Sequence, residues 1–311
     1  MPMMARLRTG IAAVVICVGM TAGGYGETPL RVTTTIFPLY DWTRQVAGDL
    51  AEVVQMVPPG ANAHLYAPRP GDLVQLHRSD VFIYLHHLME PWAPELASSA
   101  GGSRLRVVEA AADLRLQPLG GSQAEEGEAR LDPHVWLDPL LAVQMVRRIA
   151  AALVEADPAH ASHYTANAGR YVTRLESLVE HIRWSLGDCA TRTVFYAGPF
   201  PFAYFARRYD LDFHALYRGA SGEAAIGAAD LARLIQKVRG QRVRVIFHAE
   251  LFDPKAARAI AAETGARLVP LHGLHNLTAG QERRGLTYVD LMERNVQKLK
   301  EALGCRGRAG R

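Results

Sequence analysis

The sequence predicts an α/β protein of two lobes, each a mainly parallel sheet flanked by helices, joined by one long rigid helix. The chain of 311 residues is long enough for two domains, and a composition of 49% hydrophobic and 21% charged residues is typical of a globular protein. Short apolar runs alternate with helical stretches in two separate parts of the chain, which is the pattern of parallel sheets covered by helices. A long amphipathic segment lies between these parts.

Residues 1–26 have the order of a secretory signal. Arg6 and Arg8 precede the apolar run Ile11–Met20, and the small residues Thr21–Gly24 follow it. The run is too short to span a bilayer comfortably, so a signal is favoured over an uncleaved membrane anchor. We therefore expect export to the periplasm or another extracytoplasmic location.

The first lobe is expected over residues 27–156. Its expected strands are Arg31–Ile36, Val53–Val57, Val81–Leu85 and Leu105–Val108. Its expected helices are Asp41–Leu50, Pro70–Leu76 and Pro91–Ala100. The polar segment Gly120–Arg130 is expected to be a loop.

Residues 157–187 are expected to form the helix that joins the lobes. Asp157 suits the N-cap position, Pro158 suits the first helical position, and Gly187 ends the segment. An apolar stripe follows at spacings of three and four, made by Tyr164, Ala168, Tyr171, Leu175, Leu178 and Ile182. A helix of about 29 residues is about 43 Å long and would act as a stiff spine along both lobes.

The second lobe is expected over residues 188–311. Its expected strands are Thr193–Ala197, Leu211–Ala215, Val243–Phe247 and Leu268–Leu271. Its expected helices are Phe202–Tyr209, Ala228–Arg239, Pro254–Thr264 and Tyr288–Leu303.

The three cysteines have no metal-site spacing. Cys17 lies within the signal, and the bulky residues before it disfavour lipid attachment. In an oxidising compartment Cys189 and Cys305 can form one disulfide, and the alternative is two free, partly buried thiols.

Charge excludes one class of partner. The net charge of +4 is small, and the basic residues form no stripe interleaved with aromatic side chains, so nucleic-acid binding has no support.

Several histidines follow predicted strands. His64 and His134 lie in turn-rich loops of the first lobe, His248 ends a strand of the second lobe, and His272 and His275 follow Leu268–Leu271. The carboxyl ends of parallel strands converge on the ligand crevice of an open sheet, and imidazole is a good zinc ligand. Spacing alone leaves open a shared metal site or single histidines that stabilise turns.

Two segments carry a resemblance to a known family. VPPGANAHLYAPRPGDL (Val57–Leu73) and DPHVWLDP (Asp132–Pro139) resemble the hallmark segments of the zinc and manganese solute-binding receptors of ABC importers. The resemblance implies that His64 and His134 are metal ligands, that the ion lies between two α/β lobes joined by a rigid helix, and that the partner is a membrane permease.

The second lobe departs from the family pattern at its ligands. The usual third ligand, a histidine or glutamate, aligns with Pro199, whose side chain cannot bind a metal, and the usual aspartate aligns with His272. The resemblance therefore assigns His272 as a ligand in place of that aspartate. Weaker candidates for the remaining position are Glu250, His275, His248, Glu223, the pair His86 and His87, and water.

A nitrogen-rich ligand set favours zinc over manganese, because imidazole suits zinc while carboxylate and water suit manganese. Two other functions stay open at this point. One is a secreted zinc hydrolase with Glu250 or Glu223 as its general base, although no HExxH segment occurs. The other is a receptor relative that has lost metal binding.

Overall fold

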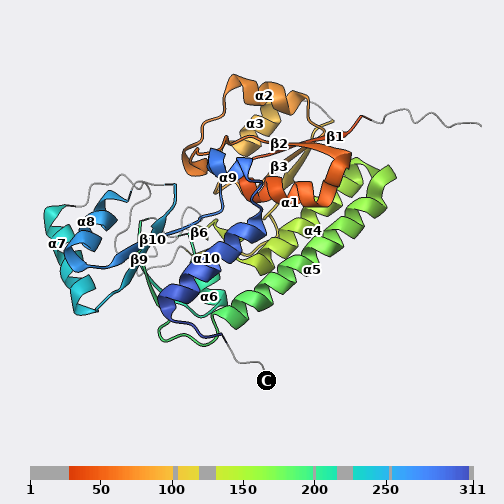
Figure 1. The fold of residues 1–311 in the computed structure, drawn as a ribbon. Helices are drawn as coiled ribbons and strands as arrows, with labels where there is room; N and C mark the ends of the chain where they lie inside the picture. The colour runs from red at the N-terminus through yellow and green to blue at the C-terminus, as the bar shows by residue number, and fades with distance from the viewer. Residues whose placement is uncertain are drawn as a thin grey trace, which may run out of the picture.

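The structure, a computed structural model, describes residues 28–100, 104–118, 131–198, 201–215, 227–251 and 254–307. Two four-stranded parallel sheets lie in separate lobes, with long helices running along both (Figure 1). The predicted fold class is confirmed. The expected signal, the expected loop Gly120–Arg130, Pro199 and Glu223 lie outside the described residues. Among the residues that the structure does describe, no helix is long and apolar enough to cross a membrane.

The first sheet has the strand order β2-β1-β3-β4, and every pairing in it is parallel. Its strands are β1 (Leu30–Thr34), β2 (Ala51–Gln55), β3 (Val81–Tyr84) and β4 (Arg106–Glu109). Its helices are α1 (Phe37–Ala47), α2 (Pro70–His77) and α3 (Ala93–Ser99), with a 3-10 turn at Gly48–Leu50. The central strand β3 is fully buried, as expected of a parallel strand covered on both faces.

The second sheet has the order β10-β9-β7-β8 and is again parallel. Its strands are β7 (Thr193–Ala197), β8 (Asp212–Ala215), β9 (Val245–Ala249) and β10 (Arg267–Leu271). Its helices are α6 (Ala203–Arg208), α7 (Ala228–Gly240), α8 (Lys255–Thr264), α9 (Ala279–Arg283) and α10 (Tyr288–Leu303). A short antiparallel pair, β5 (Gln117–Pro118) and β6 (Leu131–Asp132), lies between the two lobes in sequence.

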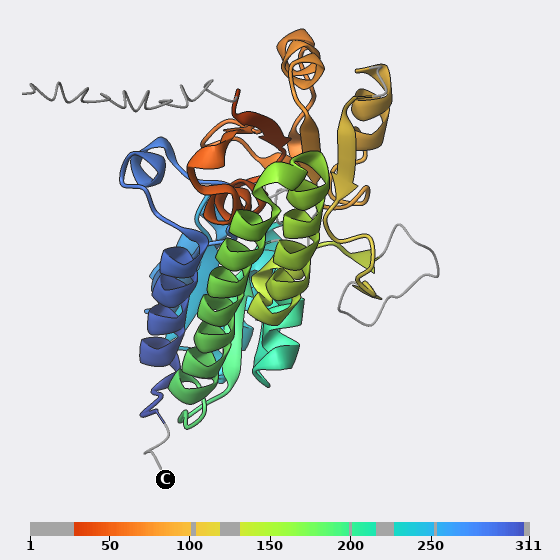
Figure 2. The same cartoon turned by 90° about the vertical axis from the view of Figure 1, so that its right-hand side faces the viewer.

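The spine is a pair of helices where one was expected. The expected helix corresponds to α5 (Ala161–Ser185). A second helix, α4 (Pro139–Ala156), precedes α5 in the chain and packs along it, and it was not predicted from the sequence. Its start signal is present, because the Asp138 side chain accepts the N–H of Leu140 and Pro139 occupies the first turn. Figure 2 shows these helices side by side, in green, with α10 in blue beside them.

The expected start of the spine helix, Pro158, is three residues too early. Pro158–His160 form a 3-10 turn, and the α-helix begins at Ala161. Asp157 does not cap it, since its carboxylate instead accepts the Tyr164 hydroxyl at 2.6 Å and contacts the His160 ring at 2.7 Å. The helix has 25 residues, about 38 Å at 1.5 Å per residue, and it packs against α1 of the first lobe and α10 of the second.

One hydrophobic core extends through both lobes. Buried side chains of α4, α5 and α10 belong to the same cluster as Val32 of the first sheet and Leu271 of the second. A continuous close-packed core resists relative movement of the parts that it joins. The two lobes are therefore held as one rigid unit along the helices.

Asp41 joins three of these helices at one buried point. Its carboxylate lies on α1 and accepts the Tyr171 hydroxyl of α5 at 3.2 Å and the N–H of Tyr288, the first residue of α10, at 3.0 Å. Burial raises the pKa of Asp41 above its ordinary value, although these hydrogen bonds oppose the shift.

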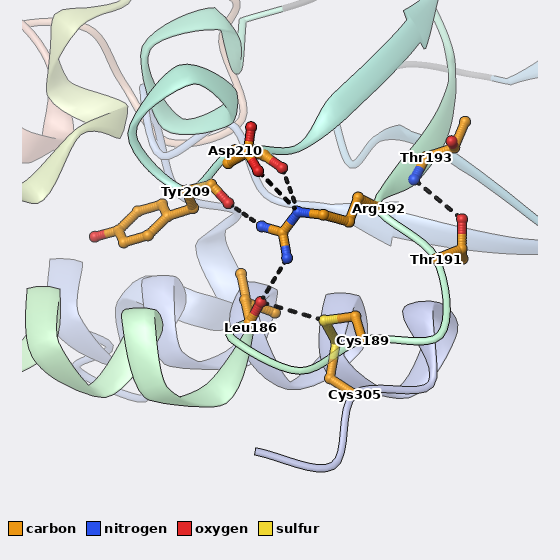
Figure 3. Close-up of a disulfide and its surroundings, with 8 residues drawn as sticks. All are labelled: Leu186, Cys189, Thr191, Arg192, Thr193, Tyr209, Asp210 and Cys305. Atoms are coloured by element: carbon orange, nitrogen blue, oxygen red, sulfur yellow. Dashed lines mark hydrogen bonds and ion pairs between the residues drawn. A yellow bond between two sulfur atoms is a disulfide. The ribbon is translucent and has the colours of Figure 1, made fainter. Parts of the chain in front are cut away.

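A disulfide closes the far end of the second lobe (Figure 3). It joins Cys189, just after the spine, to Cys305, just after α10. Beside it the Arg192 guanidinium donates to the carbonyls of Leu186 and Tyr209, so it links the spine end to the segment after α6. Gly304 ends α10 with a φ of 63°, and a Cβ there would lie 3.3 Å from that of Ala190.

We expect Asp41→Asn to make the free energy of unfolding less dependent on pH. The folded pKa of Asp41 is raised above its ordinary value of 3.8, so the stability that Asp41 contributes is fully present below about pH 4 and is lost as pH rises through the folded pKa. The Asn variant keeps an oxygen that accepts from Tyr171 and Tyr288. Between about pH 4 and pH 8, the melting temperature of the variant should therefore rise relative to that of wild type as pH rises. Asp49→Asn, at an exposed position, is the control. If the melting temperature depended on pH equally in wild type and in Asp41→Asn, the raised pKa of Asp41 would be contradicted.

We expect loss of the disulfide to lower the free energy of unfolding by about 4–5 kcal/mol in the chain-entropy model. The reason is the long loop, since the cysteines are 116 residues apart in sequence. Urea titration of Cys189→Ser/Cys305→Ser should give this loss, and a reductant should give it in wild type but change nothing in the variant. Two free thiols in a mass spectrum of unreduced protein would reject the bond.

Candidate metal centre

His64 and His134 lie close together, with their Nε2 atoms facing each other. His64 lies on a 3-10 turn (Ala63–Leu65) after β2, where the Asn62 side chain accepts its N–H at 3.0 Å. His134 follows β6, and its Nε2 lies 3.2 Å from Nε2 of His64. Two nitrogens bound to one tetrahedral zinc ion at 2.0–2.1 Å are about 3.3–3.4 Å apart. The spacing of this pair therefore matches two ligands of one ion.

Asp132 decides which nitrogen of His134 faces the crevice. The buried Asp132 carboxylate lies 2.5 Å from Nδ1 of His134 and also accepts the His134 N–H at 2.9 Å. A carboxylate in this place holds the ring proton on Nδ1 and leaves the Nε2 lone pair for a metal. Asp132 is itself tied to the second lobe, since its carbonyl accepts the Tyr204 hydroxyl at 2.7 Å.

His275 reaches the same place because residues 272–278 cross over to the first lobe. Buried Asn276 donates to the carbonyls of Pro58 and Ala61 at 2.7 and 2.8 Å, and it accepts from Gln55 at 2.9 Å. The His275 carbonyl accepts the N–H of Phe37 at 3.2 Å. We call residues 272–278 and the loop 58–62 the lobe seam. The seam fixes His275 beside the loop that carries His64, and the two ring centroids are 6.1 Å apart.

Nε2 of the His275 ring is buried and has no hydrogen-bond partner among the residues that the structure describes. Such an orphaned atom costs free energy unless a ligand satisfies it. Burial, together with the neighbouring imidazoles, lowers the pKa of His275 to about 3. Burial of its ring and the His134 imidazole lower the pKa of His64 to about 4. Both imidazoles are therefore neutral near pH 7 and able to bind a metal.

Glu250 places a carboxylate beside these three histidines. It follows β9 and lines a small cavity of about 40 Å³ with His64, His134 and His275; Tyr196, Pro201, Ala249, Leu251 and Gly273 complete the lining. One Glu250 oxygen accepts from the Gln281 side chain at 2.6 Å, and the other lies 3.2 Å from Nε2 of His272.

His272 and His248 lie outside that lining. Nδ1 of His272 accepts the N–H of Leu274 at 2.9 Å, which places the proton on Nε2, and Nε2 faces Glu250 and Gln281. The His248 ring contacts the carbonyl of Ala249 at 2.9 Å. The structure thus brings together His64, His134, His275 and Glu250, and it puts His272 behind Glu250.

Sequence reasoning missed the groups that hold these side chains. Asp132 was part of a quoted motif, and a carboxylate two residues before a histidine is a usable signal for a ring partner. Gln281 and Asn276 carried no such signal, because their partners are far away in sequence.

The chain was compared with known proteins. The family described as "Zinc-uptake complex component A periplasmic" (ZnuA) matches residues 32–302. The chain belongs to this family. The resemblance found in the sequence is therefore confirmed.

Relatives in the ZnuA family include the high-affinity zinc uptake system protein ZnuA of Bacillus subtilis, 31% identical over 88% of each chain. The zinc-binding lipoprotein AdcA of Streptococcus pneumoniae is 30% identical over 90% of this chain and 57% of its own length. The crystal structure of the Zn(II)-bound ZnuA-like domain of AdcA matches with a TM-score of 0.78 at 29% identity, covering 89% of this chain and 99% of that domain.

Proposed function

We propose that this chain is the extracytoplasmic zinc receptor of an ABC importer, and that it captures the ion in the crevice between its lobes. The carrying observation is the convergence of three imidazoles on one small cavity, one of them with a buried Nε2 that no described residue reaches with a hydrogen bond. Membership of a periplasmic zinc-uptake family and the Zn(II)-bound state of a related structure support the same function.

The proposed ligands are His64, His134 and His275, with Glu250 as the fourth. The three rings come from different loops, and the carboxylate is oriented by Gln281 and His272. Four protein ligands complete a tetrahedral zinc site, which suits tight capture. In this set His272 acts as a positioning residue for Glu250, in contrast to the ligand role that the resemblance assigned to it.

The ligand chemistry favours zinc over manganese. Three nitrogens and one carboxylate oxygen suit a borderline-soft ion, whereas manganese prefers sites rich in oxygen. Copper and nickel also bind such sites, so selection in the cell depends on metal availability as well as on the ligands.

Two other functions have less support. A zinc hydrolase needs an open coordination position and a general base, and a fourth ligand at Glu250 would fill that position and take up the one candidate base that lies among the described residues. In a receptor that has lost its metal, the buried Nε2 of His275, which has no partner in the described part of the chain, would cost free energy with no ligand to satisfy it. The proposed partner is the membrane permease that receives the ion.

We expect His64→Ala and His134→Ala each to lower zinc affinity by more than about 100-fold, since loss of even an outer-shell partner typically costs 10–100-fold. Isothermal titration of protein freed of metal by a chelator measures this. His77→Ala, on the exposed side of α2, is the matched control. Unchanged zinc affinity in the double variant His64→Ala/His134→Ala would contradict the proposed site.

The roles of His275 and His272 are separated by counting zinc-bound nitrogens with X-ray absorption. We expect three in wild type and in His272→Ala, and two in His275→Ala. Affinity in His272→Ala should fall by about 10–100-fold, because Glu250 loses its orientation. A nitrogen count that drops in His272→Ala and not in His275→Ala would return the ligand role to His272. Circular dichroism confirms that each variant is folded.

A further inference from the structure

A second group of metal-binding side chains lies at the carboxyl edge of the first sheet. His86 and His87 follow β3 after one intervening residue, Leu85, and Glu109 is the last residue of the neighbouring strand β4. Tyr84 pairs with Glu109 in the register of these parallel strands, so the rigid sheet sets the distance between the two strand ends. One ligand atom from each of the three residues lies within 4.8 Å of the others.

The distances within this group fit one ion. One Glu109 oxygen, Oε1, lies 3.1 Å from Nδ1 of His87 and 3.6 Å from Nε2 of His86. Ligand atoms on a tetrahedral zinc ion are about 3.3–3.4 Å apart, so small shifts complete the arrangement. The His87 N–H donates to the same oxygen at 3.1 Å, and the Tyr84 hydroxyl donates to the other at 3.2 Å. These two contacts fix the carboxylate in place.

We propose that His86, His87 and Glu109 form a second site for a divalent ion of the zinc class, separate from the crevice. Two imidazoles and one carboxylate suit zinc and leave the fourth position to water. The group shares no side chain with the crevice set, so each site can be emptied by mutation without touching the ligands of the other.

This second site binds more weakly than the crevice, for two reasons. The Leu88 N–H donates to Nδ1 of His86 at 3.2 Å, so the ring proton sits on Nε2, and an ion must displace that proton and break this hydrogen bond. The His87 side chain is also 49% exposed, so solvent competes for the ion and for the open position. The site therefore fills after the crevice and empties before it.

Zinc chloride titration of chelator-treated protein, with native mass spectrometry to count ions, tests the proposal. We expect two ions in wild type, one tight and one weaker. His87→Ala/Glu109→Gln should keep the tight ion and lose the weaker one. His86→Asn should weaken the second step, since Asn can still accept from Leu88 but lacks Nε2. His77→Ala is the control and should keep both ions.

The two sites can fail separately. A wild type that binds one ion, or a second ion that persists in His87→Ala/Glu109→Gln, overturns the second site. Persistence of the tight ion in His64→Ala/His134→Ala overturns the crevice assignment instead. Cobalt(II) substitution adds an independent readout, because the second step should carry tetrahedral absorption bands that disappear in His87→Ala/Glu109→Gln.

Discussion

The proposed metal centre depends on the hydrogen bonds of Asn276 across the lobe seam. This fully buried amide donates to two carbonyls of the loop before His64 and accepts from Gln55 at the end of β2. A buried amide that satisfies its partners on both sides specifies one arrangement, because any slip leaves polar groups unpaired. The seam therefore couples the end of β10 to the histidine loop of the other lobe. Together with the shared core along α5, the seam resists a large hinge motion of one lobe against the other.

The hydrogen bond at Nδ1 separates the proposed roles of His134 and His272. At His134 a carboxylate lies beside Nδ1, so the ring proton stays there and Nε2 offers its lone pair to the cavity. At His272 a backbone N–H is directed at Nδ1, so the proton moves to Nε2, which faces the Glu250 carboxylate. In the proposed site, two rings of identical chemistry thus serve as a ligand and as a support for a ligand.

The sequence allowed the two sheets to be predicted closely, because each strand is a short apolar run between turn residues. The bounds of strand Thr193–Ala197 and of helix Tyr288–Leu303 were predicted to the residue. The family motifs singled out His64 and His134. They assigned the ligand role to His272 and left His275, three residues further along the same loop, as a weaker candidate. Leu274 between them has a φ of 56°, in the left-handed region, and a backbone reversal of this kind has no periodic signature. Helix α4 was overlooked, although its Asp-Pro start resembles the one that was read at Asp157 and Pro158.

The bond between Cys189 and Cys305 places every strand of the second sheet inside one covalent ring. That ring exists only where thiols are oxidised. A newly made chain in a reducing compartment lacks it, so its unfolded form keeps more conformational entropy and threads more readily through a translocation pore. Oxidation on the far side then removes that entropy. The free energy of unfolding is therefore lower in the reduced chain, before the membrane is crossed, than in the oxidised chain after it.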